Sequence, residues 1–427
     1  MPSFLSWVLF KIQACEMMKL WFISKYFGIP EDTFFVTRHY FFSKYFVKKG
    51  INVSAISSAS SFVKIKIKDF ALRRNIKGFD YIVLKGPKIK MGANLKRVIS
   101  WFIFEYRLNL ATKKLKLEKP DIILVSSLSL LTALTAIRFK KKYGAKFIFE
   151  VRDIWPLSLV DIIGVSPKNP AVKFLAWVEK KAYENADYII GTMPRLNLHI
   201  EQVIDKPFKF MHIGQGYDPE FMSNLKPLPK EIQEMIPKDK FIVGYAGGFN
   251  LAYKLEQFVD IAQYLKDKGQ DHIVLVLMGD GPIKEKIVKL ANSLDNIVFL
   301  PRVNKNQVVS FLRQCDILAH TLRDKKIYKY GISPNKWVDY LYSARPILVS
   351  CSCDTDVVSE VNCGEILPAE KPHILAEKII EYSKKPKEEL DEMGRRGKEY
   401  LIKYMNYDYL SDKYIKVFRE VLGEATD

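Results

Sequence analysis

Apolar and polar positions alternate along the chain in a pattern that predicts short buried strands separated by amphipathic helices. Continuous apolar strands between helices are typical of a parallel sheet that is covered on both faces. In the first half, the predicted strands cover residues 19–24, 51–57, 81–85, 121–126, 146–152, 187–191 and 208–213, and the clearest helices cover 37–49, 130–142 and 169–186.

This rhythm stops at a polar, proline-rich segment, residues 217–240, which we interpret as a linker. It then restarts, so the chain is predicted to contain two doubly wound, Rossmann-like α/β domains that face each other across a cleft. The later strands are predicted at 241–246, 273–278, 297–300, 316–320 and 346–350, with helices at 255–269, 282–294, 304–314, 334–343 and from 374 to 423. The predicted boundaries are 1–17 for an N-terminal extension, 18–216, 217–240, 241–400, and 401–427 for a C-terminal helix.

Composition narrows the choice of partner. The 427 residues are 48% hydrophobic and carry 67 basic against 48 acidic side chains, a formal net charge of +19. This balance favours an anionic membrane surface or phosphorylated substrates, although a lysine-rich composition alone produces the same number. No pattern of a nucleic-acid-binding module is present, so we expect no nucleic acid partner. Five scattered cysteines do not form a disulfide framework and indicate a reducing cytoplasm.

The segment KYGISPNKWVDY predicts a helix that begins at a polar site. Ser333 suits the capping position and Pro334 the first helical position. Asn335, Lys336 and Asp339 then share one face through spacings of three and four residues. A helix start with a lysine attracts phosphate, and a carboxylate can accept hydrogen bonds from sugar hydroxyls. A capped helix with an ion pair is the alternative that this segment leaves open.

Two predicted strands of the second domain lead into glycine-rich loops. Glycines allow the backbone to approach a ligand closely, and the following helix offers N–H groups to an anion, although such loops also serve as plain turns. The loops contain Gly247 and Gly248 after one strand, and Gly279, Asp280 and Gly281 after the other.

Together these segments resemble a known family. YGISPNKWVDYLYSARPIL is similar to the signature of retaining, nucleotide-sugar-dependent glycosyltransferases of family 4, above all the bacterial O-antigen and capsule branch with its fucosamine-transferase-like enzymes. TRHY, VRDIWPLSL, VEKKAYENADYIIGTMP, GYAGG and MGDGP agree in the same order, so the resemblance covers nearly the whole chain from Met18. It implies a GT-B fold with an acceptor-binding N-terminal domain, a nucleotide-sugar-binding C-terminal domain, and a C-terminal helix that packs back on the first.

The resemblance also implies roles for residues of the second domain. Asp339 matches an acid that holds the ribose hydroxyls, and Lys336, with Lys254 as a second candidate, would offset the charge of the departing diphosphate. The family's other acid falls on Gly331, so backbone N–H groups of 331–335 would hold the sugar. That loop continues with Ile332, Ser333, Pro334 and Asn335, and the base-contacting backbone falls near Arg302 and Val303.

In the first domain, the family's glycine-rich loop corresponds to GIPEDTFFVTRHY, where Gly28 is the single glycine. Thr37 and Arg38, with His39 beside them, are therefore expected to face the diphosphate from a helix start; a helix cap with a surface arginine is the alternative. Asp153 follows a strand and is expected to orient the acceptor hydroxyl or the sugar, and a buried aspartate bonded to loop amides is the competing interpretation.

We expect no metal and no cofactor, and the UDP-sugar enters as a substrate. His320 closes a strand where it is expected to meet the ligand. The implied mechanism is a front-face displacement, in which the acceptor oxygen attacks on the side from which the diphosphate leaves.

Residues 94–116 form a basic amphipathic stretch that predicts a helix in an anionic bilayer interface; a helix facing the core is the alternative. We therefore expect transfer of an N-acetylated amino sugar to a polyprenyl-diphosphate-linked glycan, by a cytoplasmic protein peripheral to the inner face of the plasma membrane. Two alternatives remain at this point, a nucleotide-sugar epimerase on the same fold and a non-catalytic adaptor on the membrane surface.

Overall fold

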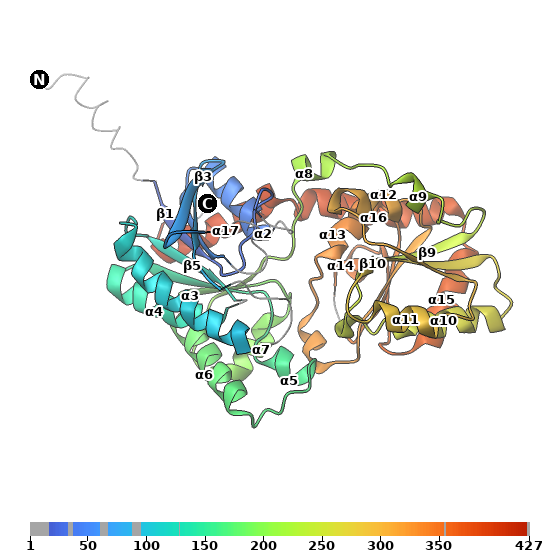
Figure 1. Cartoon of the computed structure of the whole chain (residues 1–427), viewed down its shortest axis with the longest axis horizontal. Coiled ribbons are helices and arrows are strands. Elements are labelled where there is room, and N and C mark those ends of the chain that lie inside the picture. Colours follow the sequence, from blue (N-terminus) through green and yellow to red (C-terminus); the bar gives the residue numbers. More distant parts are fainter. Residues whose placement is uncertain are drawn as a thin grey trace, which may run out of the picture.

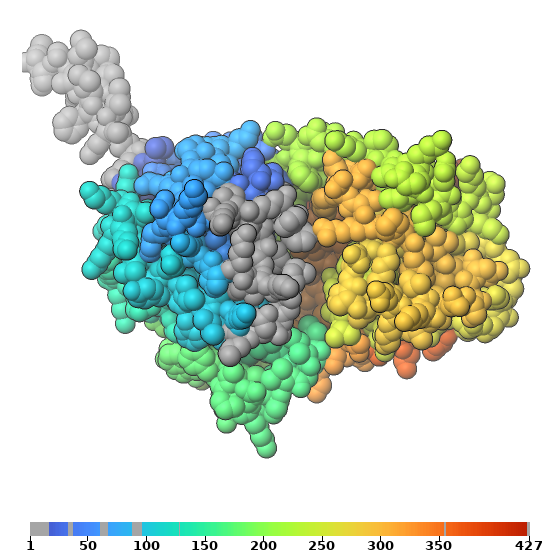
Figure 2. All heavy atoms as spheres, in the orientation of Figure 1, coloured from blue at the N-terminus to red at the C-terminus, as the bar shows by residue number. Residues whose placement is uncertain are grey.

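The structure is a computed structural model that describes residues 17–32, 37–59, 67–87, 95–127, 129–353 and 356–424. Almost all of the predicted N-terminal extension therefore lies outside the described residues. Two α/β domains lie side by side, the first coloured blue to green and the second yellow to orange (Figures 1 and 2). The predicted architecture of two doubly wound domains is confirmed.

The N-terminal domain is built on an eight-stranded sheet with the order β3-β4-β2-β1-β5-β6-β7-β8. All neighbours are parallel except β3 and β4, which form an antiparallel hairpin. The strands are β1 (Lys19–Ile23), β2 (Asn52–Ser58), β3 (Ala71–Ile76), β4 (Phe79–Leu84), β5 (Ile122–Ser126), β6 (Lys146–Val151), β7 (Tyr188–Gly191) and β8 (Phe210–His212).

Helices cover both faces of this sheet, as buried strands require. Trp21 and Ile23 of β1 belong to the core on the side of α3, α4 and α6, whereas Leu20 and Phe22 pack on the side of α2. The helices are α2 (Arg38–Lys48), α3 (Leu95–Lys114), α4 (Thr132–Tyr143), α5 (Leu157–Asp161), α6 (Pro170–Asn185) and α7 (Leu196–Val203).

The C-terminal domain has a six-stranded, fully parallel sheet with the order β11-β10-β9-β12-β13-β14. Its strands are β9 (Phe241–Gly248), β10 (Ile273–Asp280), β11 (Ile297–Leu300), β12 (Ile317–Thr321), β13 (Ile347–Ser350) and β14 (Gly364–Leu367). Its helices are η1 (Leu251–Tyr253), α10 (Glu256–Asp267), α11 (Lys284–Leu290), η2 (Lys305–Gln307), α12 (Val308–Leu312), η3 (Lys326–Tyr330), α13 (Lys336–Ser343), α14 (Val357–Glu360), α15 (Pro372–Ser383) and α16 (Lys387–Tyr404).

The chain ends in helix α17 (Tyr407–Leu422), which returns to the N-terminal domain (Figure 1). Tyr414 of α17 packs edge-on against Phe42 of α2, with ring centroids 4.6 Å apart. The predicted return of the C-terminal helix is therefore confirmed, although α16 runs across the predicted boundary at residue 400 and ends at Tyr404.

The prediction missed two strands and part of the linker. Strand β3 joins β4 through Lys77 and Gly78, both with positive φ, which is the geometry of a tight hairpin turn. Short helices α8 (Pro219–Ser223) and α9 (Lys230–Gln233) interrupt the segment that the prolines marked as linker. Helix α8 forms there because Pro219 stands at its first position and Asp218 caps it.

Candidate active site

Lys336 lies in an aromatic pocket beside the end of β9. As the first residue of α13, its ammonium sits 3.7 Å from the ring centroid of Tyr253 and 4.2 Å from that of Tyr245. It donates a hydrogen bond to the Tyr245 hydroxyl at 3.0 Å. Within the described part of the chain, it forms no ion pair with a carboxylate, and burial lowers the pKa of Lys336 well below its usual value.

Gly247 provides the space for this ammonium. A Cβ at position 247 would lie 2.7 Å from Lys336 Nζ, so a larger residue would displace the charge. A buried cation without a counter-ion is costly, and a bound anion removes that cost. The pocket therefore suits a phosphate group.

Asp339 lies one turn further along α13 and is only 4% exposed. Its Oδ2 pairs with Lys305 Nζ, which reaches over from η2 and is half exposed. Its Oδ1 is buried and has no hydrogen-bond partner among the described residues. Burial raises the pKa of Asp339, and Lys305 opposes that shift. A buried carboxylate oxygen without a donor suits a ligand hydroxyl.

Two aromatic side chains hold α13 in place against the sheet. The Tyr340 hydroxyl accepts from Ala246 N at 2.9 Å, and Trp337 Nε1 donates to His320 Nδ1 at 3.1 Å. The His320 ring is fully buried beside Trp337 and Tyr253. His320 fixes Trp337, and its contact with the ligand stays a prediction.

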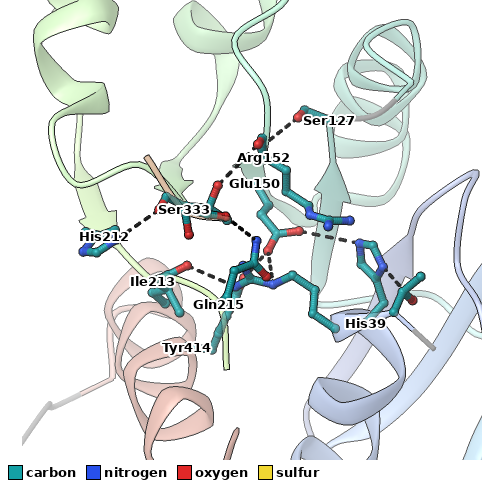
Figure 3. Close-up of polar contacts among 12 residues, drawn as sticks. His39, Ser127, Glu150, Arg152, His212, Ile213, Gln215, Ser333 and Tyr414 are labelled. Atoms are coloured by element: carbon teal, nitrogen blue, oxygen red, sulfur yellow. Dashed lines mark hydrogen bonds and ion pairs between the residues drawn. The ribbon is translucent and has the colours of Figure 1, made fainter. Parts of the chain in front are cut away.

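The predicted helix start is also wrong by two residues. Helix α13 begins at Lys336 after Asn335, and neither Ser333 nor Pro334 is helical. The Ser333 carbonyl accepts a hydrogen bond from Gln215 Nε2 of the N-terminal domain at 3.4 Å, so this loop spans the two domains (Figure 3). The chain therefore forms a loop where the sequence favoured a cap.

The loop from Gly331 to Asn335 contains fewer available donors than the resemblance implies. Gly331 N already donates to Tyr328 O at 2.9 Å, and Pro334 has no N–H. Ile332, Ser333 and Asn335 keep N–H groups that have no hydrogen-bond partner among the described residues. Three donors, not five, remain to bind a sugar.

The structure itself requires a glycine at position 331. Its φ is +88°, and a Cβ there would lie 2.5 Å from the ring of Pro194 in the N-terminal domain. A glutamate at this position would clash and would be strained. The departure from the family pattern at Gly331 thus coincides with a direct contact between the domains.

The glycines at the ends of β9 and β10 serve the sheet itself. These strands run further than predicted, and Gly279 pairs in register with Gly247. A Cβ at Gly279 would lie 1.9 Å from Gly247 O, and one at Gly281 would lie 2.3 Å from Phe249 O. Close contact between two strands therefore explains both residues, which the sequence assigned to ligand approach.

A shallow cavity of about 400 Å³ adjoins this end of β10. Lys284 Nζ donates to Gly279 O at 2.7 Å and to Leu300 O at 2.9 Å, so it ties the ends of β10 and β11 together. The cavity is lined by Asp280, Gly281, Pro282, Lys284, Glu285 and Val288.

The remaining candidates of this domain lie in nearby loops. Arg302 is exposed and Val303 is half-buried, between β11 and η2. Lys254 follows η1 with φ +46°, a backbone conformation that favours glycine. Their roles toward a ligand stay predictions.

On the other side, Arg38 and His39 begin α2 and are buried. Arg38 Nε lies 3.3 Å from Glu150 Oε1, and Arg38 Nη2 donates to Ile213 O at 3.1 Å. His39 Nδ1 lies 3.1 Å from Thr37 Oγ1, which bonds the backbone of Gly28. The surface arginine considered in the sequence is therefore wrong, because Arg38 is 4% exposed.

Glu150 is the centre of this group, and the sequence analysis missed it. Burial alone would raise its pKa, but the cations Arg38 and Arg152 outweigh burial and hold the pKa of Glu150 at about 2. Tyr414 of α17 donates to Glu150 Oε1 at 2.6 Å. Alternation along β6 places Glu150 and Arg152 on one face, which is the signal that would have found them.

Asp153 has both carboxylate oxygens occupied. Trp155 Nε1 donates to Oδ2 at 2.9 Å and Ser158 Oγ to Oδ1 at 2.5 Å. These partners are side chains rather than the loop amides of the alternative interpretation. Asp153 therefore shapes the loop after β6, and contact with an acceptor stays a prediction.

A search for metal ligands gives a negative result within the described ranges. No group of three or more His, Cys, Asp or Glu side chains is arranged to hold a metal ion. Cys351, Cys353 and Cys363 are buried thiols at the ends of β13 and before β14. Independence from metal stays a prediction.

Comparison with known proteins supplies the family. Residues 230–400 match the family model described as glycosyl transferases group 1. The probable glycosyltransferase WbjE of Pseudomonas aeruginosa is 20% identical over 346 residues, which cover 78% of this chain and 82% of the relative.

The chain has the GT-B fold, and its residues 230–400 match the group 1 glycosyltransferase family.

Solved structures agree with that fold. The sucrose-phosphate synthase of Thermosynechococcus elongatus has a TM-score of 0.74 at 14% identity, and covers 95% of this chain and 99% of its own. A structure titled trehalose-6-phosphate from E. coli bound with UDP-2-fluoro glucose has a TM-score of 0.71 at 10% identity, over 94% and 99% of the two chains. The lipopolysaccharide-biosynthesis glycosyltransferase WaaG has a TM-score of 0.63 at 14% identity, over 93% and 99%.

The glycosyltransferase family match covers the domain that carries Lys336 and Asp339. It begins at residue 230, inside the predicted linker, and includes all six strands of the second sheet. The enzyme is therefore a hexosyl-type transferase whose best-defined site lies on α13.

Proposed function

We propose that this glycosyltransferase moves an N-acetylated amino sugar from a UDP-sugar to a lipid-linked glycan in bacterial surface polysaccharide synthesis, with retention of the anomeric configuration. The observation that carries the proposal is the pair of unmet groups on α13, a half-buried Lys336 without an anion and a buried Asp339 oxygen without a donor. A nucleoside diphosphate supplies both, phosphate to the ammonium and ribose hydroxyls to the carboxylate.

In this mechanism, the acceptor oxygen attacks the sugar on the face from which the diphosphate leaves. Lys336 would offset the negative charge that develops on the leaving phosphate, and that phosphate would take the acceptor proton. N–H groups of Ile332 and Ser333 lie in the loop just before α13 and would orient the sugar. The UDP-2-fluoro glucose bound to the E. coli protein of the same fold supports the choice of UDP.

The experiment is incubation of the purified protein with a panel of nucleotide sugars and a bacterial lipid extract. We expect a new glycolipid with one preferred UDP-sugar, and none from the Asp339→Asn variant. Free epimerised nucleotide sugar without acceptor would instead establish an epimerase. A protein that neither binds nor turns over any nucleotide sugar would be an adaptor, and the proposal would fall.

The membrane part of the proposal is supported by the exposed face of α3. Ile99, Phe102 and Tyr106 repeat at helical spacing and are 48%, 54% and 67% exposed, while Phe104 and Leu108 pack into the core. Among the described helices, none is long and apolar enough to cross a bilayer. The proposed contact is therefore with the membrane surface.

This surface can be tested by charge reversal. Glutamate replacing five basic residues of α3 should move the protein out of the membrane fraction, and Leu251→Ser, an exposed apolar position of the other domain, should leave fractionation unchanged. Unchanged fractionation of the five-fold variant would remove the membrane from the proposal. The five residues are Lys96, Arg97, Arg107, Lys113 and Lys114.

A further inference from the structure

Buried polar atoms without a partner gather at the carboxyl ends of β1, β5 and β6. Native proteins pair nearly all such atoms, so a concentration of unpaired ones marks a place where a ligand or an ion belongs. Within the described residues, the atoms are Ser24 Oγ, Ser126 Oγ, Arg38 Nη1, His39 Nε2, Glu150 Oε2 and Arg152 Nε.

The sheet brings these side chains together. Ser126 pairs in register with Glu150, and Ser24 follows the last residue of the adjacent strand β1. Arg38 and His39 approach from the start of α2, and Tyr414 closes the group from α17. Figure 3 shows Glu150 beside His39, with Arg152 next to both. The cluster thus lies where ligands of parallel α/β sheets bind.

The charges in this cluster do not balance. Glu150 is ionised, and Arg38 and Arg152 are cations, whereas burial and the nearby charge of Arg152 lower the pKa of His39 well below its usual value and keep the ring neutral. Tyr414 is neutral because burial raises its pKa. One positive charge is therefore left over, and neighbouring Lys413, which donates to His212 O at 2.8 Å, adds to it.

The surplus positive charge in this cluster belongs to Arg152. Arg38 is engaged with Glu150 and with Ile213 O, and its guanidinium also stacks 4.9 Å from the Phe42 ring. The Arg152 guanidinium, in contrast, has no ion pair and no hydrogen bond among the described residues. The bonds of Arg152 are those of its backbone, from its N–H to Ser127 Oγ at 2.9 Å and from Thr192 Oγ1 to its carbonyl oxygen at 3.4 Å. The neighbouring Asp153 carboxylate is already occupied by Trp155 and Ser158.

We propose that Arg152 binds a phosphate group beside the Glu150 and Arg38 pair. A guanidinium presents paired donors that match phosphate oxygens. The Gln215 to Ser333 hydrogen bond connects this side of the molecule to the loop before α13, so the phosphate would lie at the interface of the two domains. This inference rests on the proposed function, because that function supplies the phosphate. The phosphate belongs either to the lipid-linked acceptor or to the donor diphosphate.

The test is calorimetric titration of inorganic pyrophosphate into the protein, both without UDP and after saturation with UDP. Wild type should bind pyrophosphate and gain thermal stability from it. Arg152→Gln should weaken that binding by about tenfold or more, Arg152→Lys should recover part of it, and Arg73→Gln, an exposed arginine on edge strand β3, should behave as wild type.

The outcomes distinguish the two possible sources of the phosphate, the acceptor and the donor diphosphate. If Arg152→Gln loses pyrophosphate and keeps UDP affinity, the site holds a phosphate of the acceptor. If UDP affinity falls by a similar factor, the site holds the donor diphosphate. Wild type that neither binds pyrophosphate nor gains stability from it overturns the proposal, even if Arg152→Gln fails to fold. Pyrophosphate binding at Arg152 without any glycolipid product would leave the site standing and remove the proposed function.

Discussion

The molecule holds two groups of charged side chains, one in each domain, and they are built in opposite ways. In the N-terminal domain, the Glu150 carboxylate is surrounded by Arg38, His39 and Tyr414. In the C-terminal domain, Lys336 and Asp339 lie on one helix but do not pair with each other. Lys336 contacts aromatic rings, and Asp339 contacts a half-exposed lysine.

This difference separates groups that hold the fold from groups that await a ligand. A buried carboxylate that is already paired stabilises the protein chiefly because its loss would leave its partners uncompensated. A buried ammonium that has no counter-ion destabilises the ligand-free protein and gains on binding an anion. Substitutions in the two groups should therefore affect different measurements.

The largest expected effect is that of Glu150→Gln. It leaves Arg38 and Arg152 buried without a counter-charge, so the free energy of unfolding should fall by about 3–5 kcal/mol in urea denaturation. Glu118→Gln, which removes an exposed carboxylate paired with Lys19, should cost less than about 0.5 kcal/mol. Equal stability of Glu150→Gln and wild type would show that this carboxylate does not hold the domain together.

The pH dependence of protein stability tests the same comparison between the two charged groups. The pKa of Glu150 is about 2 in the folded protein against an ordinary value of 4.5. The stability that Glu150 contributes is therefore present above about pH 4.5 and is lost as the pH falls toward about 2. The difference between wild type and Glu150→Gln should shrink across that window.

Lys336→Met should show the reverse pattern. Without the ammonium, UDP binding should weaken by about ten- to a hundredfold in calorimetry. Stability should stay equal or rise, because an unpaired buried charge is replaced by an apolar side chain of similar length. Lys286→Met removes an exposed cation of α11 and should change neither quantity. A large loss of stability in Lys336→Met would place this lysine with the structural group.

The fold was readable from the sequence wherever a strand was buried on both faces. All seven apolar runs of the first half are strands, because covered parallel strands leave no room for polar residues. Strand β3 was missed because it is an edge strand that carries Arg73 and Arg74. Strand β14 was missed because its short run, half-buried from Gly364 to Ile366, shows no apolar pattern.

The site was readable only where it is contiguous. Lys336 and Asp339 stand three residues apart on one helix, so spacing alone brought them together. Glu150, Arg38 and Tyr414 come from a strand and two helices far apart in the sequence, and only the fold unites them. Lys305 was missed for the same reason. It reaches Asp339 from η2, which no helical spacing connects to α13.

A smaller expected effect is the uptake of protons when UDP binds. Burial lowers the pKa of Lys336 well below its usual value, and a bound diphosphate would raise it again. UDP binding should therefore take up protons on the alkaline side of that lowered pKa, and affinity should weaken as the pH rises through it. Calorimetry in buffers of different ionisation enthalpy measures this uptake directly. Lys336→Met should abolish it, and Lys286→Met should retain it.

The smallest effect should come from Lys305→Met. In the absence of ligand, Lys305 occupies Asp339 Oδ2, the oxygen that a second ribose hydroxyl would use beside the free Oδ1, and its own side chain is half exposed. Such a pair contributes little, about 1 kcal/mol or less, and is replaceable by a ligand. UDP affinity should therefore stay within about fivefold of wild type, on the side of tighter binding, because no ion pair has to be displaced. A tenfold loss would show instead that Lys305 contacts the nucleotide, and the two charged groups would then differ less than their ligand-free contacts suggest.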